Sequence, residues 1–259
     1  ISMSGIAHLL FEKGYKLKGS DKSLSDNVQA LINIGVEVYI GQKKENIKNP
    51  DLIVYTDAIS DDNEELIEAR KLQAPVVTRG VFLGALMRNY KNSIAISGSH
   101  GKSTATSMIS KILLHSEENP TILLGGKLED MEGNVKVGSE DFLVTEACEY
   151  KGNIRYYYPQ TVIILNIDED HLDYYKDLED IVETFKVYLR NQDKNSKTIL
   201  NLNEENNKLV LDAVQGELIT YGQENPDADY NATNIKFDEI GRPSFDLVMK
   251  NGDIEHFKL

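Results

Sequence analysis

A glycine-bearing turn is the segment of the sequence with the clearest capacity for chemistry. It reads Gly98-Ser99-His100-Gly101-Lys102-Ser103-Thr104 and joins an apolar strand pattern to an amphipathic helix pattern. In that setting, main-chain N–H groups and the positive end of the helix converge on anionic oxygens, which is typical of phosphate binding. The sequence therefore predicts that this turn binds ATP, with Lys102 at the β- and γ-phosphates and the Ser103 hydroxyl as a ligand of Mg²⁺.

The spacing of the turn differs from that of the most common phosphate-binding loop. Ile96 stands at the position where the common pattern has its first glycine. The alternative interpretation is that the glycines only join a strand to a helix and that Lys102 is solvated. The Gly-Lys-Ser order at the mouth of the helix favours phosphate binding.

Two further groups, Glu146 and His171, follow predicted buried strands at Phe142–Thr145 and Val162–Ile167. In doubly wound sheets, ligands bind in the crevice beyond the carboxyl ends of the strands, so both groups are expected beside the phosphate-binding turn. A carboxylate there suits Mg²⁺, which prefers oxygen ligands. Lys102, Glu146 and His171 are therefore the predicted catalytic residues.

Other polar residues near these strands have a plainer interpretation. Cys148 is expected to be a packed small side chain, because no base is identifiable beside it. Runs of charge usually form a solvated rim. This alternative applies to Glu149, Asp168, Glu169, Asp170 and Asp173.

The elements that would position these groups form two blocks. Residues 1–89 alternate predicted helices and strands, which suggests a small parallel sheet in a Rossmann-like domain. Asp62 is the predicted N-cap of a helix there, with Glu65 three residues later. Gly19-Ser20-Asp21 lies at the end of one strand in this block, where Rossmann-like folds place an acid near a ribose. Thr56-Asp57-Ala58-Ile59-Ser60 lies at the end of a later strand, and the alternative for both segments is an ordinary turn.

Residues 90–259 begin with the strand Ser93–Ser97 and a helix from Lys102, with a predicted apolar face made by Met108, Ile109, Ile112 and Leu113. Apolar runs of strand length follow and favour a largely parallel sheet. After Pro226 the pattern changes to a short antiparallel meander, with Asn251-Gly252 as a type I′ turn. The fold class is α/β, and the domain boundary is inferred from this second strand–helix start.

The composition excludes several classes of protein. Acidic residues outnumber basic ones by 42 to 28, and the net charge of -14 argues against partners such as nucleic acid and anionic membranes. No apolar run approaches the roughly 20 residues that span a bilayer. The single cysteine excludes an internal disulfide framework, so the expected location is the cytoplasm. The chain starts at Ile1 and runs straight into a helical pattern, which suggests a fragment that lacks its first strand.

The phosphate-binding turn resembles the Gly-Thr-His/Asn-Gly-Lys-Thr-Thr signature of the Mur ligase family, with serines at two threonine positions. Three further stretches are similar to the family in the same order, so the resemblance spans nearly the whole chain. They are Met3-Ser4-Gly5-Ile6-Ala7, Glu146-Ala147-Cys148-Glu149-Tyr150 and Asn166-Ile167-Asp168-Glu169-Asp170-His171-Leu172-Asp173-Tyr174-Tyr175.

The resemblance implies an ATP-dependent amide-bond ligase of peptidoglycan synthesis. It implies that the lactyl carboxylate of UDP-N-acetylmuramate is phosphorylated by ATP and that L-alanine then displaces phosphate, with amino-acid contacts from a third domain absent here. It implies Mg²⁺ at Ser103 and Glu146 and a second metal at His171. The UDP-sugar would lie near Ser20, Asp21, Ala58 and Ser60. The alternatives left open are a murein tripeptide recycling ligase, a folylpolyglutamate-type synthetase and a P-loop module without ligase activity.

Overall fold

The computed structural model describes residues 2–128, 131 and 133–258. The chain divides into two compact units, each built from segments distant in sequence. The first unit comprises Ile1–Ser93 and Ser103–Glu146, and the second comprises Ile94–Lys102 and Ala147–Leu259. The domain boundary predicted near residue 89 stays a prediction.

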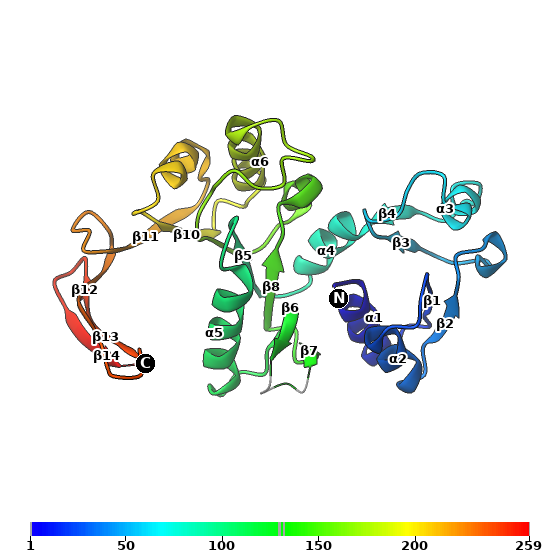
Figure 1. The fold of residues 1–259 in the computed structure, drawn as a ribbon, viewed down its shortest axis with the longest axis horizontal. Helices are drawn as coiled ribbons and strands as arrows, with labels where there is room; N and C mark the ends of the chain where they lie inside the picture. The colour runs from blue at the N-terminus through cyan, green and yellow to red at the C-terminus, as the bar shows by residue number, and fades with distance from the viewer. Residues whose placement is uncertain (1, 129–130, 132, 259) are drawn as a thin grey trace. The chain divides into compact units, whose positions relative to one another are not determined.

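The first unit alternates helices with short parallel strands (Figure 1). Strands β1 and β2 pair in parallel, and so do β3 and β4, in two separate two-stranded sheets. The predicted strand–helix alternation is therefore confirmed. The elements of residues 2–87 are α1 (Ser2–Glu12), β1 (Lys18–Asp21), α2 (Asp26–Asn33), β2 (Glu37–Ile40), the 3₁₀ helix η1 (Lys44–Asn46), β3 (Ile53–Tyr55), α3 (Glu64–Ala69), β4 (Val76–Thr78) and α4 (Arg79–Met87).

Local chemistry explains where these helices begin and end. The Ser25 and Thr78 side chains cap α2 and α4 by accepting main-chain N–H hydrogen bonds. Gly14 ends the first helical segment with φ +85°, as predicted. The predicted cap at Asp62 is wrong, because the Asn63 side chain accepts the Leu66 N–H at 3.1 Å. The N-cap of α3 is therefore the side-chain oxygen of Asn63, one residue later in the chain than predicted.

The first unit also contains β6 (Thr121–Leu128), β7 (Gly133–Lys136) and most of β8 (Phe142–Ala147). β6 pairs in parallel with β8 and antiparallel with β7. Helix α1 contacts β6 and β7, and a β-carbon at Gly5 would lie 3.1 Å from a Val135 methyl carbon. The glycine thus allows the helix to approach the strand closely.

The second unit is built on a sheet with the strand order β14-β13-β12-β11-β10-β9-β5 (Figure 1). The pairings from β5 to β12 are parallel and the last two are antiparallel, so the predicted sheet with a terminal meander is confirmed. Its strands are β5 (Asn92–Ser97), β9 (Thr161–Ile164), β10 (Lys197–Asn201), β11 (Glu217–Gln223), β12 (Tyr230–Phe237), β13 (Pro243–Met249) and β14 (Ile254–Lys258).

Helix α6 (Leu178–Arg190) packs against the 3₁₀ segments η3 (Tyr150–Tyr156) and η4 (Glu205–Ala213). The Asp177 side chain caps its first turn, and Phe185 and Leu189 on its inner face are fully buried. The parallel strands bury Ile96, Val162, Ile164 and Leu200. This continuous apolar core holds the strand ends, and hence the loops that follow them, in fixed positions.

Two local predictions are wrong. Asn251 does not have the positive φ that a type I′ turn needs, and only Gly252 is left-handed, at φ +90°. The Gly252 N–H donates to the Met249 carbonyl, which is the pattern of a type I turn followed by a glycine bulge. On α5 (Lys102–Leu114), Ile109 and Leu113 are half-buried but Met108 and Ile112 are 51% and 69% exposed, so the prediction is wrong for two of the four residues of the apolar face.

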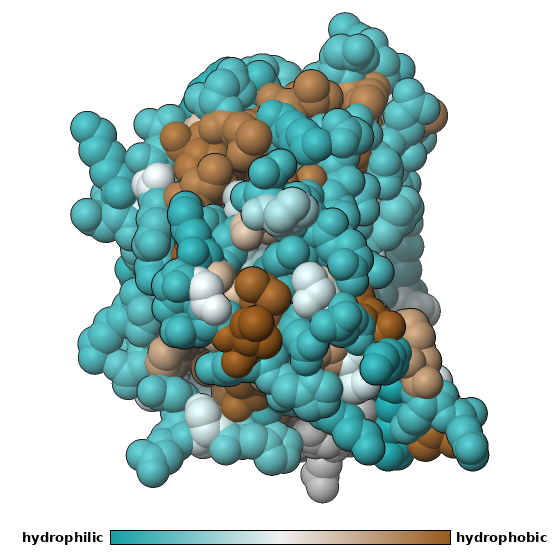
Figure 2. Space-filling model, turned by 90° about the vertical axis from the view of Figure 1, so that its left-hand side faces the viewer, coloured by the Kyte–Doolittle hydropathy of each residue, from teal (hydrophilic) through white to brown (hydrophobic). Residues whose placement is uncertain are grey.

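The described helices include none that is both long and apolar enough to cross a membrane. The face drawn in Figure 2 is mostly hydrophilic, as expected from the excess of acidic residues, with separate hydrophobic areas. Isolated exposed apolar side chains are normal on folded proteins.

Candidate functional site

The turn after β5 requires glycine at two positions. Gly98 has φ +138° and Gly101 has φ +81°. A β-carbon at Gly98 would lie 3.0 Å from the carbonyl oxygen of Asn166 and 3.1 Å from its nitrogen. Conformation and space therefore both favour glycine, and the main chain of the turn can approach a ligand closely.

Asn166, which follows β9, holds the turn from the side of the neighbouring strand. The Ser99 N–H donates to the Asn166 carbonyl at 3.1 Å, and the His100 N–H donates to the Asn166 side chain at 2.8 Å. The Asn166 amide returns a hydrogen bond to the His100 carbonyl at 3.1 Å. The Ser99 hydroxyl exchanges two hydrogen bonds with the main chain of Asp168. The turn is thus held in an ordered conformation.

Lys102 begins helix α5 and directs its side chain back over the turn. Its ammonium nitrogen Nζ donates to the carbonyls of Gly98 and Ser99 at 2.5 and 3.1 Å. The same nitrogen lies 3.1 Å from each carboxylate oxygen of Glu149. A cation is therefore fixed at the centre of the predicted phosphate-binding turn.

Glu149 is buried, with a side chain that is 1% exposed. A solvated acidic rim was the alternative for this residue, and that interpretation is wrong. A buried carboxylate is costly unless charges or hydrogen bonds compensate it, and Lys102 supplies the charge. The signal in the sequence was its place three residues after Glu146, within a stretch that already resembled a functional motif.

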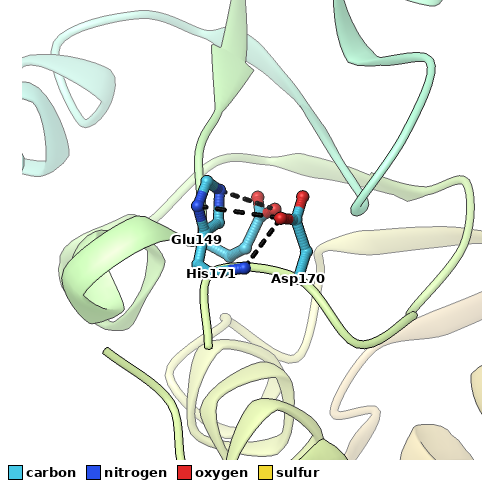
Figure 3. A group of neighbouring side chains, drawn as sticks. All are labelled: Glu149, Asp170 and His171. Atoms are coloured by element: carbon cyan, nitrogen blue, oxygen red, sulfur yellow. Dashed lines mark hydrogen bonds and ion pairs between the residues drawn. The ribbon is translucent and has the colours of Figure 1, made fainter. Parts of the chain in front are cut away.

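His171 and Asp170 complete a cluster with Glu149 (Figure 3). His171 Nε2 lies 3.7 Å from Glu149 Oε1, and His171 Nδ1 lies 3.8 Å from Asp170 Oδ1. The His171 backbone is left-handed, with φ +53°, and its N–H donates to Asp170 Oδ1 at 2.7 Å. A left-handed residue other than glycine is strained, and such strain concentrates at functional sites.

The donor atoms of Glu149, Asp170 and His171 all lie within 4.8 Å of one another. Two carboxylates offer the hard oxygen ligands that Mg²⁺ prefers, and the imidazole offers a nitrogen. The residues present therefore fit a divalent cation. Lys102 belongs to the same unit as this cluster. The carboxylate predicted from the sequence as a metal ligand was Glu146, which is not one of these three residues.

Glu146 lies in the first unit, at the end of β8. One of its carboxylate oxygens accepts the Gly125 N–H at 2.7 Å. Ser103 and Thr104 follow Lys102 in the first turn of α5, and both are exposed. Their predicted contacts with Mg²⁺ and ATP stay predictions.

The predicted UDP-sugar residues lie at strand ends, as expected. The Ser20 hydroxyl donates to Glu65 at 2.5 Å, and Asp21 accepts the Ser23 N–H. The Ala58 N–H donates to Thr56, and the Ser60 hydroxyl donates to Asp62. The contacts of Asp21, Ala58 and Ser60 are local, whereas that of Ser20 joins β1 to α3, and the binding role of the four residues stays a prediction.

Tyrosines surround the cluster. The Tyr150 ring lies 4.7 Å from the His171 ring, centroid to centroid, and its hydroxyl donates to Asp173 at 2.9 Å. Asp173, left without a role in the sequence analysis, therefore orients a ring that packs on the histidine. The Tyr175 hydroxyl donates to the main-chain carbonyl of Glu149 at 2.5 Å.

Comparison with known proteins identifies the family of the chain. Two family models match: the Mur ligase family catalytic domain over residues 1–91 and the Mur ligase middle domain over residues 96–259. Curated relatives named UDP-N-acetylmuramate--L-alanine ligase are 44% identical in Clostridium botulinum strain Okra and 46% identical in Clostridium tetani. Both alignments cover 100% of this chain and 56% of the relative, so the chain spans about half the length of these relatives.

Solved structures share the fold. The crystal structure of the UDP-N-acetylmuramate-alanine ligase MurC from Thermotoga maritima aligns with a TM-score of 0.82 at 25% identity, covering 100% of this chain and 58% of that one. The UDP-N-acetylmuramate:L-alanyl-gamma-D-glutamyl-meso-diaminopimelate ligase from Neisseria meningitides has the same fold, with a TM-score of 0.82 at 22% identity over 97% of this chain and 82% of that one. On the strength of the family models and the phosphate-binding turn, the chain belongs to the Mur ligase family.

Proposed function

We propose that the protein that contains this chain is an ATP-dependent ligase of peptidoglycan precursor synthesis. It joins L-alanine to the lactyl carboxylate of UDP-N-acetylmuramate. The observation that carries the proposal is the ordered turn Gly98–Lys102, with the Lys102 ammonium fixed beside Glu149 and His171. The names of the relatives at 44–46% identity support the choice of substrates.

The reaction has two steps. A carboxylate oxygen of UDP-N-acetylmuramate attacks the γ-phosphorus of ATP, and the bond to ADP breaks, which leaves an acyl phosphate. The amine nitrogen of L-alanine then attacks the acyl carbon. The carbon–oxygen bond to phosphate breaks, inorganic phosphate leaves, and the amine loses its proton as the amide forms.

Residues of the turn hold the polyphosphate in this proposal. Phosphoryl transfer depends on positioning and on neutralising negative charge, so the Lys102 ammonium and the main-chain N–H groups of the turn other than those of Ser99 and His100, which donate to Asn166, supply most of the stabilisation. For Lys102 to contact phosphate oxygens, its contacts with the Gly98 and Ser99 carbonyls must give way at least in part. The hydrogen bonds between Asn166 and His100 hold the conformation of the turn while Lys102 changes its contacts.

A divalent cation, Mg²⁺, would be held by Glu149, Asp170 and His171. When bound, it would neutralise charge on the reacting oxygens. Glu149 replaces Glu146 as the main carboxylate of the proposal, because it lies with Lys102 and His171. Ser103 and Glu146 stay candidate ligands of a further Mg²⁺.

In this proposal, residues 1–89 form the domain that binds the UDP-sugar and residues 90–259 form the domain that binds ATP. The family models, which meet between residues 91 and 96, support this boundary. Ser20, Asp21, Ala58 and Ser60 are the proposed UDP-sugar contacts. L-alanine would be bound by a part of the protein outside this chain, and the cytoplasm stays the proposed location, supported by the single cysteine, Cys148.

A murein peptide ligase is the second candidate. The structure of such a ligase from Psychrobacter arcticus matches this chain with a TM-score of 0.82, as high as that of the alanine ligase. Fold alone therefore does not separate the two. The identity of the curated relatives favours L-alanine over a peptide as the amine.

The proposal is tested by ADP release from the full-length protein. ADP should form only when both UDP-N-acetylmuramate and L-alanine are present, and a murein tripeptide should not replace L-alanine. Lys102→Ala should lower the rate by about 10²- to 10³-fold or more, the range for removal of a preorganised donor. Lys111→Ala, on the same helix, is the control and should keep the parent rate. ADP release without L-alanine, or full activity in Lys102→Ala, would defeat the proposal.

A further inference from the structure

Tyr175 connects Glu149 and His171, two of the three residues in the proposed metal cluster. Its main-chain N–H donates to the His171 carbonyl at 3.0 Å. Its side-chain hydroxyl donates to the Glu149 carbonyl at 2.5 Å. One residue therefore ties together the segment after β8 and the segment after β9, at the two places where the cluster takes its donors.

The tyrosine is well placed to hold this connection. Its side chain is among the largest that are fully buried, with 2% of the residue exposed. Burial raises the pKa of the Tyr175 hydroxyl to about 12, so the group keeps its proton and remains a donor at neutral pH. The Glu149 carbonyl also accepts the Gly152 N–H at 2.9 Å, where the backbone turns through a left-handed glycine.

The connection matters because Glu149 lies on an irregular stretch of main chain. The residue lies between the end of β8 and the irregular segment η3, where Lys151 and Gly152 both have positive φ. A carboxylate on such a segment binds a cation well only if its backbone is held. The His171 carbonyl likewise accepts a second hydrogen bond, from the Tyr174 N–H, so Tyr175 is the residue that the two carbonyls share.

We propose that Tyr175 is a positioning residue for metal binding, whose hydroxyl sets the place of Glu149 relative to His171. The inference rests on the proposed function, because it takes Glu149 and His171 as ligands of a divalent cation. Loss of a partner that orients a metal ligand typically weakens metal affinity by about 10- to 100-fold. The hydroxyl touches neither the cation nor the substrates in this scheme.

Tyr175→Phe in the full-length protein is the direct test, because it removes only the hydroxyl and keeps the ring and the N–H that contacts His171. Tyr188→Phe is the matched control. Tyr188 is also fully buried, and its hydroxyl has no hydrogen-bond partner among the described residues. Thermal unfolding of both variants verifies that they are folded at the temperature of the assay.

Metal affinity is measured with Mn²⁺ as the probe, by electron paramagnetic resonance, in the presence of a non-hydrolysable ATP analogue. Tyr175→Phe should bind Mn²⁺ about 10- to 100-fold more weakly than the parent. It should also need a correspondingly higher Mg²⁺ concentration for half-maximal ligase rate, with kcat at saturating Mg²⁺ within a few-fold of the parent. Tyr188→Phe should match the parent in both measurements.

Glu149→Gln separates failure of this inference from failure of the proposed metal site. If the parent binds Mn²⁺ more tightly than Glu149→Gln but Tyr175→Phe binds it as tightly as the parent, the positioning role is overturned and the metal site stands. If the parent and Glu149→Gln bind Mn²⁺ equally, Glu149 is not a ligand and both ideas are overturned. Equal weakening in Tyr175→Phe and Tyr188→Phe would also overturn the inference, because it would reflect loss of core packing.

Discussion

The ammonium nitrogen of Lys102 lies 3.1 Å from both carboxylate oxygens of Glu149, in a site where the glutamate is 1% exposed and the lysine 15%. Two charges removed from water in this way depend on each other. The turn Gly98–Lys102 and the cluster of Glu149, Asp170 and His171 are therefore one electrostatic system.

A double-mutant cycle should measure that dependence. Lys102→Ala alone should destabilise the protein, because it leaves Glu149 buried without this cation, and Glu149→Gln should recover part of the loss. The expected coupling free energy is about 0.5 to 3 kcal/mol, the range for residues in contact. Urea unfolding of the four proteins without nucleotide gives the value. Strict additivity of the two changes would show that the pair is energetically independent.

Gly98→Ala should damage nucleotide binding more than the fold. A left-handed φ of +138° and a β-carbon 3.0 Å from the Asn166 carbonyl oxygen both oppose the substitution. Strain of this kind costs about 1 to 3 kcal/mol, so the KM for ATP should rise roughly 5- to 100-fold. Gly126→Ala is the control, because its β-carbon would meet nothing within 4 Å. An unchanged KM for ATP in Gly98→Ala would contradict the assigned role of the turn.

Glu149→Gln and Glu146→Gln decide between the two candidate carboxylates. The Mg²⁺ concentration for half-maximal rate should rise at least about 10-fold in Glu149→Gln. Loss of a group that only orients a metal ligand weakens metal affinity by about 10- to 100-fold, and loss of the ligand itself should weaken it at least as much. Glu146→Gln should change it less, because the donor atoms that lie within 4.8 Å of one another are those of Glu149, Asp170 and His171. Magnesium titration of the ligase rate checks both. A larger effect at Glu146 would return the site to the original sequence prediction.

Asp229 should give the second unit a stability that is lost in acid. Its carboxylate accepts Lys250 Nζ at 2.7 Å and both the N–H and the hydroxyl of Thr220 at 2.9 Å. The hydrogen bond from Lys250, followed by that from the Thr220 N–H, lowers the pKa of Asp229. A lowered pKa in the folded state means that the stabilisation is complete above the ordinary pKa of about 3.9 and disappears as pH falls through the folded-state value.

Asp229→Asn should therefore reduce the free energy of unfolding at neutral pH by roughly 1.5 to 3 kcal/mol, the range for a hydrogen bond to a charged group. The difference from the parent should shrink as pH falls below about 4. Urea unfolding at several pH values gives both results, with the exposed Asp227→Asn as the control. A difference that stays constant down to acid pH would contradict the assignment.

Features carried by local sequence were predictable, while features set by tertiary packing were not. The strand, turn and helix around Gly98–Lys102 were predicted because periodicity and glycine are local signals. The burial of Glu149 was not, since an acidic residue among acidic neighbours is usually solvated. Nor could the sequence identify Asn166 as the residue that holds the turn, because that role exists only when β5 and β9 are adjacent.

Helix α5 illustrates the same limit. Periodicity predicted the helix but not which of its residues are covered. Thr106 and Ser110 are buried. Of the predicted apolar face, Ile109 and Leu113 are half-buried and Met108 and Ile112 are exposed. The short tyrosine hydrogen bond to Glu149 has no sequence signal either, because its partner is a main-chain carbonyl.

Transfer of oxygen-18 tests the central claim most directly. UDP-N-acetylmuramate labelled with oxygen-18 in the lactyl carboxylate is incubated with the full-length protein, ATP and L-alanine, and the released phosphate is examined by phosphorus NMR. An acyl phosphate intermediate predicts one labelled oxygen in the phosphate formed with each amide bond. Phosphate that carries no label would mean that the carboxylate never reached the γ-phosphorus of ATP, and the ligase mechanism built around Lys102 and Glu149 would be wrong.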